Sequence, residues 1–149
     1  MPSMDRQTVM IFGVGTLQKS IIERAKAMGL RTVGIDPCAD AACRDAVDIF
    51  EIVGGQDYEG TLAAMQRNNV SAIVTAATDK PLVMMARVAE ALHLPFMSLE
   101  TAQCSTDKFR MKRRFQENGV PCARGRLLAC ADDAEGLAFP LIVKPRDNS

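Results

Sequence analysis

The stretch TVMIFGVGTLQKSIIERAKAMGLRTVGID, residues 8–36, contains a short apolar run, a glycine turn, an amphipathic segment and a second apolar run. The runs at 8–12 and 31–36 have strand character, and the spacing between them predicts a helix over 16–28 that Gly29 ends. A strand, a helix and a second strand in this order predict a βαβ unit whose two strands are parallel. The apolar face that this spacing predicts for the helix comprises Leu17, Ile21, Ala25 and Met28.

Short apolar runs and helical patterns continue to alternate through residue 98. Strands are predicted at 49–53, 70–75 and 95–98, and the 70–75 run is almost continuously apolar, as expected for a strand covered on both faces. Helices are predicted at 57–68 and from about residue 78 to residue 92. The sequence therefore predicts an α/β fold: a Rossmann-like open parallel sheet of about five strands, with helices on both faces, over residues 1–103.

The segment TDKFRMKRRFQENGVP, residues 106–121, has the pattern of a complete helix with both of its ends. Ser105 or Thr106 can cap its start, Asp107 places a negative charge where the helix dipole favours one, and Gly119 can end it. A charge run of this kind is most often a solvated helix face. The five cations on this helix are Lys108, Arg110, Lys112, Arg113 and Arg114.

The last part of the chain has strand character at 123–129, a small acidic helical turn at 132–137, and the run FPLIVKP at 139–145. This run predicts a buried strand that ends on Lys144. A lysine directly after three apolar residues would be partly desolvated, and its charge would be costly unless an anion met it. The alternative is an ordinary lysine at a strand end that extends to water.

Asp107-Lys108, Lys112, Phe115, Gly119-Val120-Pro121 and residues 139–145, in this order and spacing, resemble the opening of an ATP-grasp domain. That superfamily includes biotin carboxylase, the large subunit of carbamoyl phosphate synthetase and the purine-pathway carboxylate–amine ligases. The resemblance covers the whole chain, because residues 1–103 are similar to the domain that precedes ATP-grasp in those enzymes. It implies that residues 104–149 are the incomplete N-terminal part of an ATP-grasp domain, and that a longer protein continues after Ser149.

The resemblance also implies an activity and a set of ligands. In such ligases ATP phosphorylates a carboxylate or bicarbonate, and an amine-type nucleophile attacks the acyl phosphate; carbamoyl phosphate synthetase is the most similar subgroup. Lys108 and Lys144 match basic residues that contact ATP, and the turn from Gly15 through Thr16 to Gln18 borders the acceptor-substrate pocket. The Mg²⁺ ligands are expected beyond residue 149, so the fragment itself is expected to be inert, with no catalytic residue of its own. Relatives are often homodimers.

The same glycine turn supports a second hypothesis. Gly13-Val14-Gly15-x-x-Gln18, followed by Asp36, approximates the fingerprint of a dinucleotide-binding site. Gln18 occupies the position of the third glycine and weakens that match, and a plain tight turn between strand and helix explains the same residues. The alternative function is a non-catalytic module that binds NAD or another nucleotide.

Residues 75–80, TAATDK, lie where the fourth predicted strand ends. Open parallel sheets bind their ligands at this edge, so Asp79 is a candidate contact for the substrate. The alternative for Asp79 or Thr78 is a helix cap.

Composition narrows the class of protein. The formal net charge is zero, so no basic excess indicates nucleic acid, and no apolar run is long enough to span a membrane. The first residues are too polar for a signal peptide, so we expect a cytoplasmic protein whose partners are ATP and a small carboxylate. The five cysteines show no CxxC spacing and are predicted to be free thiols, mostly buried. His93, the single histidine, is predicted in the last turn of a helix, and no metal site is predicted.

Overall fold

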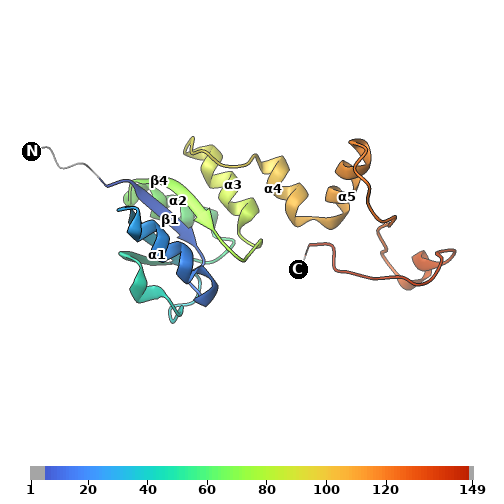
Figure 1. The fold of residues 1–149 in the computed structure, drawn as a ribbon, viewed down its shortest axis with the longest axis horizontal. Coiled ribbons are helices and arrows are strands. Elements are labelled where there is room, and N and C mark those ends of the chain that lie inside the picture. Colours follow the sequence, from blue (N-terminus) through green and yellow to red (C-terminus); the bar gives the residue numbers. More distant parts are fainter. Residues whose placement is uncertain (1–5, 148–149) are drawn as a thin grey trace, which may run out of the picture.

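In a computed structural model, which describes residues 6–147, the chain is elongated. A layered body of strands and helices forms the N-terminal part, and two helices then lead away from it toward a C-terminal segment that has no strand among its described residues (Figure 1). The candidate substrate residues lie in the layered body, and the two candidate ATP-contacting lysines lie in the part of the chain that follows α4 (Leu99–Thr106).

The sheet contains four parallel strands in the described part of the chain, in the order β3-β2-β1-β4. β1 (Thr8–Phe12) lies in the middle, between β2 (Arg31–Asp36) and β4 (Val70–Thr75), and β3 (Ile49–Ile52) forms one edge. All five residues of β1 are buried, because a central strand has hydrogen-bonded neighbours on both sides and helices over both faces. The predicted α/β fold with a parallel sheet is confirmed.

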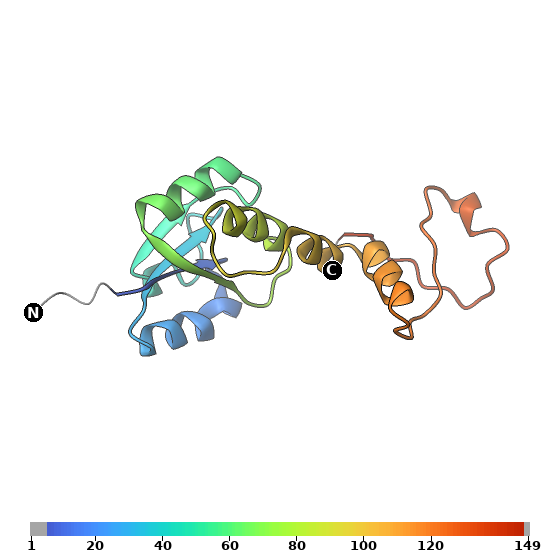
Figure 2. The same ribbon diagram turned by 90° about the horizontal axis from the view of Figure 1, so that it is seen from above.

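Helices cover both faces of this sheet (Figure 2). On one face lie α1 (Lys19–Ala27), which the short 3-10 turn η1 (Thr16–Gln18) precedes, and the turn η2 (Arg44–Ala46). On the other face lie α2 (Tyr58–Arg67), which Asp57 caps as predicted, and α3 (Leu82–Ala91).

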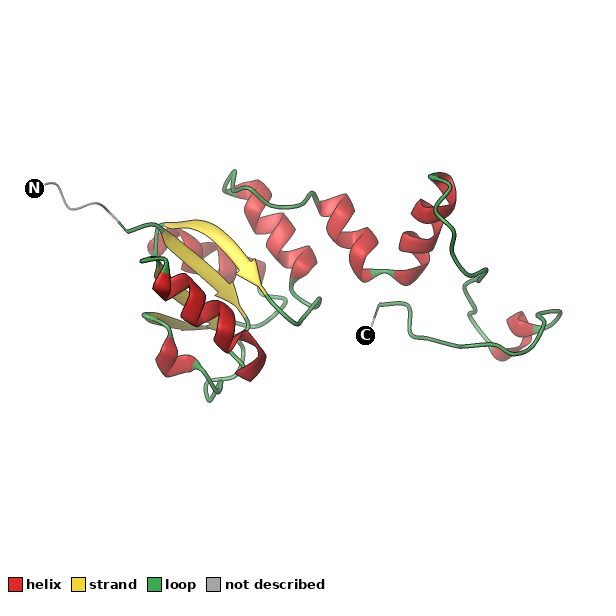
Figure 3. Ribbon diagram, viewed as in Figure 1, coloured by secondary structure: helices red, strands yellow, loops and turns green. Residues whose placement is uncertain are grey.

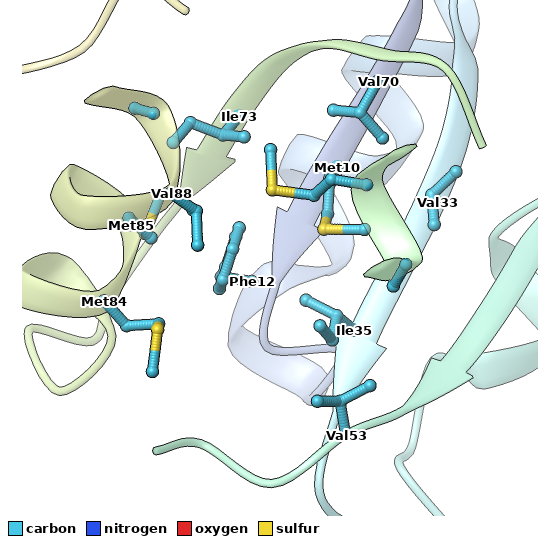
Figure 4. Packing of buried hydrophobic residues seen from close by; sticks show 13 residues of the cluster. Met10, Phe12, Val33, Ile35, Val53, Val70, Ile73, Met84, Met85 and Val88 are labelled. Carbon is cyan, nitrogen blue, oxygen red and sulfur yellow. The ribbon is translucent and has the colours of Figure 1, made fainter. Parts of the chain in front are cut away.

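The larger core fills the space between the sheet and the helices α2 and α3 (Figure 4). Met10 and Phe12 of β1 point into it, because alternate residues of a strand face the same side. Met65 of α2 and Met85 of α3 are fully buried in the same cluster, so methionine serves here as core filling. Ile11 and Val14 face the opposite side and pack against Ile22 of α1.

The predicted apolar face of the first helix is only half right. Leu17 and Met28 are 69% and 61% exposed, whereas Gln18, Ile22 and Ala25 are buried. The 3-10 turn at the start has a different period from the α-helix, so it rotates residue 17 toward solvent.

The fifth predicted strand, 95–98, is wrong. These residues form a connection in which Pro95 has no N–H to give to a ladder, and Ser98 caps the next helix by accepting a hydrogen bond from the Thr101 amide. His93 is not in the last turn of α3 but just after it, in the left-handed conformation (φ 53°) that ends a helix.

The C-terminal part contains α4 (Leu99–Thr106), α5 (Lys108–Glu117) and the 3-10 turn η3 (Ala131–Ala134) (Figure 3). Only Asp107 separates α4 from α5, and a long loop leads from α5 to η3. α5 is capped by Asp107 itself rather than by Ser105 or Thr106, and Gly119 takes the expected left-handed conformation after it. The boundary predicted near residue 104 falls inside α4, and the division into two domains stays a prediction.

Residues 123–129 and 139–145 form no strand in the described part of the chain, contrary to prediction. A strand needs a neighbour for its backbone N–H and C=O groups, and residues 6–147 provide none beside either segment. Phe139, Ile142 and Val143 are consequently 77–86% exposed. The cysteines also differ from prediction: only Cys43 is buried, and Cys38 and Cys130 are exposed.

Replacing Met85 by alanine tests the main core. We expect Met85→Ala to lower the free energy of unfolding by about 2–5 kcal/mol, because it leaves a cavity among fully buried side chains. Met28→Ala is the matched control, since that exposed side chain should change the same quantity by less than about 0.5 kcal/mol. Urea unfolding of the chain measures both, and equal effects would contradict the assigned core.

Candidate functional site

The first candidate site lies where the strands β1 and β4 end. Gly13 has φ +85° and opens a turn in which Gln18 folds back over the loop. The Gln18 side chain is buried; its Oε1 accepts a hydrogen bond from the Gly15 amide at 3.1 Å, and its Nε2 donates to the Ala76 carbonyl at 2.5 Å. Gln18 therefore joins the turn after β1 to the turn after β4, which lie at the same edge of the sheet.

The geometry of this turn leaves little room for a pyrophosphate. Gln18 fills the place that a third glycine would leave open, and a Cβ atom added at Gly15 would lie 3.2 Å from Gln18 Oε1. Both oxygens of the Asp36 carboxylate accept backbone amides, one from Val14 and one from Cys38, each at 2.9 Å. These contacts favour a tight structural turn over a dinucleotide-binding site.

The four predicted substrate residues lie on this edge of the sheet. Gly15 is half-buried and Thr16 exposed in the β1 turn, and Asp79 is half-buried in the β4 turn. The helix after this turn begins at Leu82 with Pro81 at the cap position and no side-chain cap, so Asp79 is not its capping residue. Their role toward a substrate stays a prediction.

The second candidate site is the start of α5, where Asp107 connects distant parts of the chain. Its Oδ1 accepts the amides of Phe109 and Arg110, each at 3.0 Å, and so caps the helix. Its Oδ2 accepts Arg146 Nε at 2.7 Å and lies 2.6 Å from a second guanidinium nitrogen of Arg146. The hydrogen bond from Arg146, supported by the two backbone amides, lowers the pKa of Asp107 from 3.8 to about 2.

The same contact brings together the segments that carry the two predicted ATP-contacting lysines. The Lys108 amide donates to the Arg146 carbonyl at 2.9 Å, and Lys144 lies two residues before that carbonyl. Lys144 is exposed, so the expectation that burial makes its charge costly does not hold in this chain. Its role toward ATP, like that of Lys108, stays a prediction.

Farther along α5, Lys112 holds the following loop, because its Nζ donates to the Ala123 carbonyl at 3.0 Å.

Between α4, α5 and Arg146 lies an open cavity of about 510 Å³. The arginines that line it are paired with acids: Arg114 lies 3.5 Å from Glu100, and Arg113 lies 3.5 Å from Glu117.

Within residues 6–147, no group of three or more His, Cys, Asp or Glu side chains could hold a metal ion.

Sequence reasoning missed Arg146 as a contact of Asp107. The two residues are 39 positions apart, and an arginine one residue after Lys144-Pro145 carries no local pattern that names its partner. The signal that could have found it is the pairing of a helix-capping carboxylate with a cation in a segment expected to lie nearby.

No protein-family model matches the chain. A curated relative, formate-dependent phosphoribosylglycinamide formyltransferase from Wolinella succinogenes, is 26% identical over 145 residues, which covers 92% of this chain and 37% of the relative. The solved L-amino acid ligase from Bacillus licheniformis superposes with a TM-score of 0.80 at 21% identity, over 96% of this chain and 38% of that one. N5-carboxyaminoimidazole synthetase from Staphylococcus aureus, solved with ADP, gives 0.78 at 22% identity, over 96% and 39%.

The chain shares its fold with a part of each of these two solved enzymes. The predicted resemblance to ATP-grasp enzymes is confirmed as a likeness of fold along nearly the whole chain, which spans less than two-fifths of the length of these relatives. The subgroup resembling carbamoyl phosphate synthetase is not tested by these comparisons. No helix in the described residues combines the length and the apolar character needed to cross a membrane.

Replacing Gln18 tests the connection between the two turns. We expect Gln18→Ala to lower the free energy of unfolding by about 1–3 kcal/mol, because it leaves the Gly15 amide and the Ala76 carbonyl without this partner in a half-buried place. Gln66→Ala, at an exposed position of α2, is the control and should change stability by less than about 0.5 kcal/mol. Indistinguishable unfolding midpoints would contradict a structural role for Gln18.

The pKa of Asp107 predicts a pH dependence at the start of α5. Because the folded-state pKa is lowered, the stabilising contribution is fully present above the unfolded value of 3.8 and is lost as the pH falls toward about 2. Amide hydrogen exchange of Phe109 and Arg110 should accelerate, relative to the intrinsic rate, across this window in the wild type. In Asp107→Asn, which cannot titrate, the same amides should show no transition there; a transition that persists would assign it to another group.

Proposed function

We propose that this chain is the N-terminal portion of an ATP-dependent ligase that activates a carboxylate or bicarbonate as an acyl phosphate for attack by an amine-type nucleophile. The observation that carries the proposal is the contact at the start of α5, which joins the segments of Lys108 and Lys144. These segments follow a Rossmann-like sheet in the sequence. The likeness to a formate-dependent formyltransferase, an L-amino acid ligase and a synthetase solved with ADP, along nearly the whole chain, supports it.

The charges of Lys108 and Lys144 are complementary to those of the ATP phosphates. Lys108 is half-buried at the first position of α5, and Lys144 is exposed on the adjoining segment; both carry the positive charge that phosphates attract. The helix start itself is not the phosphate site, because Asp107 already accepts the Phe109 and Arg110 amides. ATP supplies the phosphoryl group, and the lysines bind and orient it; the Mg²⁺ ligands are expected after residue 149.

The acceptor substrate would bind at the other candidate site, the edge where β1 and β4 end. Gly15, Thr16 and Gln18 come from one turn and Asp79 from the other, and Gln18 fixes the spacing of these turns. Ligands of open parallel sheets bind at this edge, which supports the assignment.

Within this proposal three finer statements come from the family resemblance: the subgroup resembling carbamoyl phosphate synthetase, a homodimer, and a two-domain division near residue 104. A cytoplasmic location is a fourth, and it comes from the composition of the sequence. An assay of bicarbonate against formate and amino acids as ATPase-stimulating acceptors decides the subgroup.

The alternative is a non-catalytic module that binds NAD or another nucleotide. The contacts of Gln18 and Asp36 argue against it, since both side chains are already used by the backbone. The coding sequence directly after Ser149 discriminates between the two. A glycine-rich segment followed by spaced acidic residues and an asparagine favours the ligase, whereas a stop codon there favours the module.

Replacing Lys144 tests the nucleotide site in the full-length protein. We expect Lys144→Ala to weaken binding of ATP with Mg²⁺ by about 1.5–3 kcal/mol, the worth of a hydrogen bond to a charged group. Lys19→Ala, an exposed lysine of α1, is the control and should bind ATP as the wild type does.

Calorimetric titration with ATP and, in parallel, with NAD measures these affinities. Binding of NAD but not of ATP would contradict the proposal and favour the Gly13–Asp36 fingerprint. The isolated 149-residue chain is the negative control for activity, and ATP turnover by it would contradict its expected inertness.

A further inference from the structure

Asp107 uses its two carboxylate oxygens for two different purposes. Oδ1 accepts the two amides that begin α5, as a cap does, while Oδ2 faces Arg146. A serine or threonine cap has one side-chain oxygen and would serve only the first purpose. The carboxylate therefore does more at this position than end a helix.

Arg146 reaches Asp107 from a segment that has no other regular structure. Two of its guanidinium nitrogens lie 2.7 and 2.6 Å from Oδ2, and its carbonyl accepts the Lys108 amide at 2.9 Å. The Asp107 side chain is only 14% exposed, although it carries a charge. Arg110 lies farther away, with Nε 3.6 Å from the same oxygen, and is also bonded to Gln103.

These contacts fix the spacing between two short pieces of backbone. Lys108 directly follows Asp107, and Lys144 precedes Arg146 by two residues. While the contacts hold, the backbones of the two lysines therefore stay close together in space. Without them, residues 139–147 have no strand partner within the described residues and no regular structure to hold Lys144 in place.

We propose that Asp107 and Arg146 are positioning residues, a clamp that presents Lys108 and Lys144 together to the phosphates of one nucleotide. This inference rests on the proposed function. Neither side chain of the clamp touches the nucleotide; each acts through the lysine beside it. The clamp makes ATP affinity depend on an acid–base pair that is not itself part of the phosphate contact.

The structure offers a matched control for this pair. Arg67 and Glu51 form a similar contact in the sheet body, with Nε and a terminal nitrogen of Arg67 at 3.0 and 2.6 Å from the carboxylate oxygens of Glu51. The exposures are similar, 53% and 17% for this pair against 46% and 14% for Arg146 and Asp107. Removing either arginine deletes an equivalent ion pair, but only one lies beside the lysines.

Titration of the full-length protein with ATP and Mg²⁺ tests the clamp. We expect Arg146→Ala and Asp107→Asn each to weaken ATP binding about fivefold, which is the upper range for an exposed ion pair. Asp107→Asn keeps the capping oxygen, so its effect reports the lost contact with Arg146 rather than a lost cap. The double variant should bind no more weakly than either single variant, because both remove the same contact. Arg67→Ala should bind ATP within twofold of the wild type.

Hydrogen exchange gives a second measurement that does not need ATP. In the 149-residue chain, protection of the Lys108 amide should fall in Arg146→Ala and in Asp107→Asn but not in Arg67→Ala. If the wild type binds ATP and Arg146→Ala binds it as tightly as Arg67→Ala does, the positioning role is overturned and the proposed function stands. If the full-length wild type binds no ATP, the proposed function fails and the positioning role fails with it.

Discussion

The rest of the structure depends on the parallel pairing of β1 with strands on both of its sides. β1 bonds to β2 along one edge and to β4 along the other, and all of its residues are buried. Parallel strands end at the same edge, so this pairing places the turn after residue 12 beside the turn after residue 75. Two segments more than sixty residues apart along the chain thereby form one surface, and Gln18 then joins them by a side-chain bond.

The C-terminal segment shows what happens where such pairing is lacking. Leu141, Ile142 and Val143 are as apolar as the residues of β1, yet they remain exposed. Apolar character favours burial, but a strand is stable only when a neighbour satisfies its backbone groups. Within the described residues, this segment is held to α5 by Arg146, through its side chain to Asp107 and its backbone to Lys108.

Local patterns in the sequence predicted much of this fold. Four strands, the helices at 57–68 and after residue 80, and the glycine stop after α5 follow from apolar spacing and from turn residues, whose causes lie within a few positions. The strand at 95–98 failed because Pro95 and the cap at Ser98 outweighed a short apolar run. The prediction of a buried strand at 139–145 failed because a buried strand depends on neighbouring strands, which no local pattern reveals.

In the candidate sites, too, local patterns predict single residues but not the contacts between distant ones. The family resemblance marks Lys108 and Lys144, and the strand-like run before Lys144 also marks that residue, but no local pattern connects the two lysines. The connection comes from Asp107, whose capping role is visible in the sequence and whose second oxygen meets a partner 39 residues away. Gln18 repeats this arrangement in the sheet body: it interrupts a glycine motif, and its amide satisfies a backbone carbonyl 58 residues away. In both places one polar side chain serves its own turn and a distant segment at once.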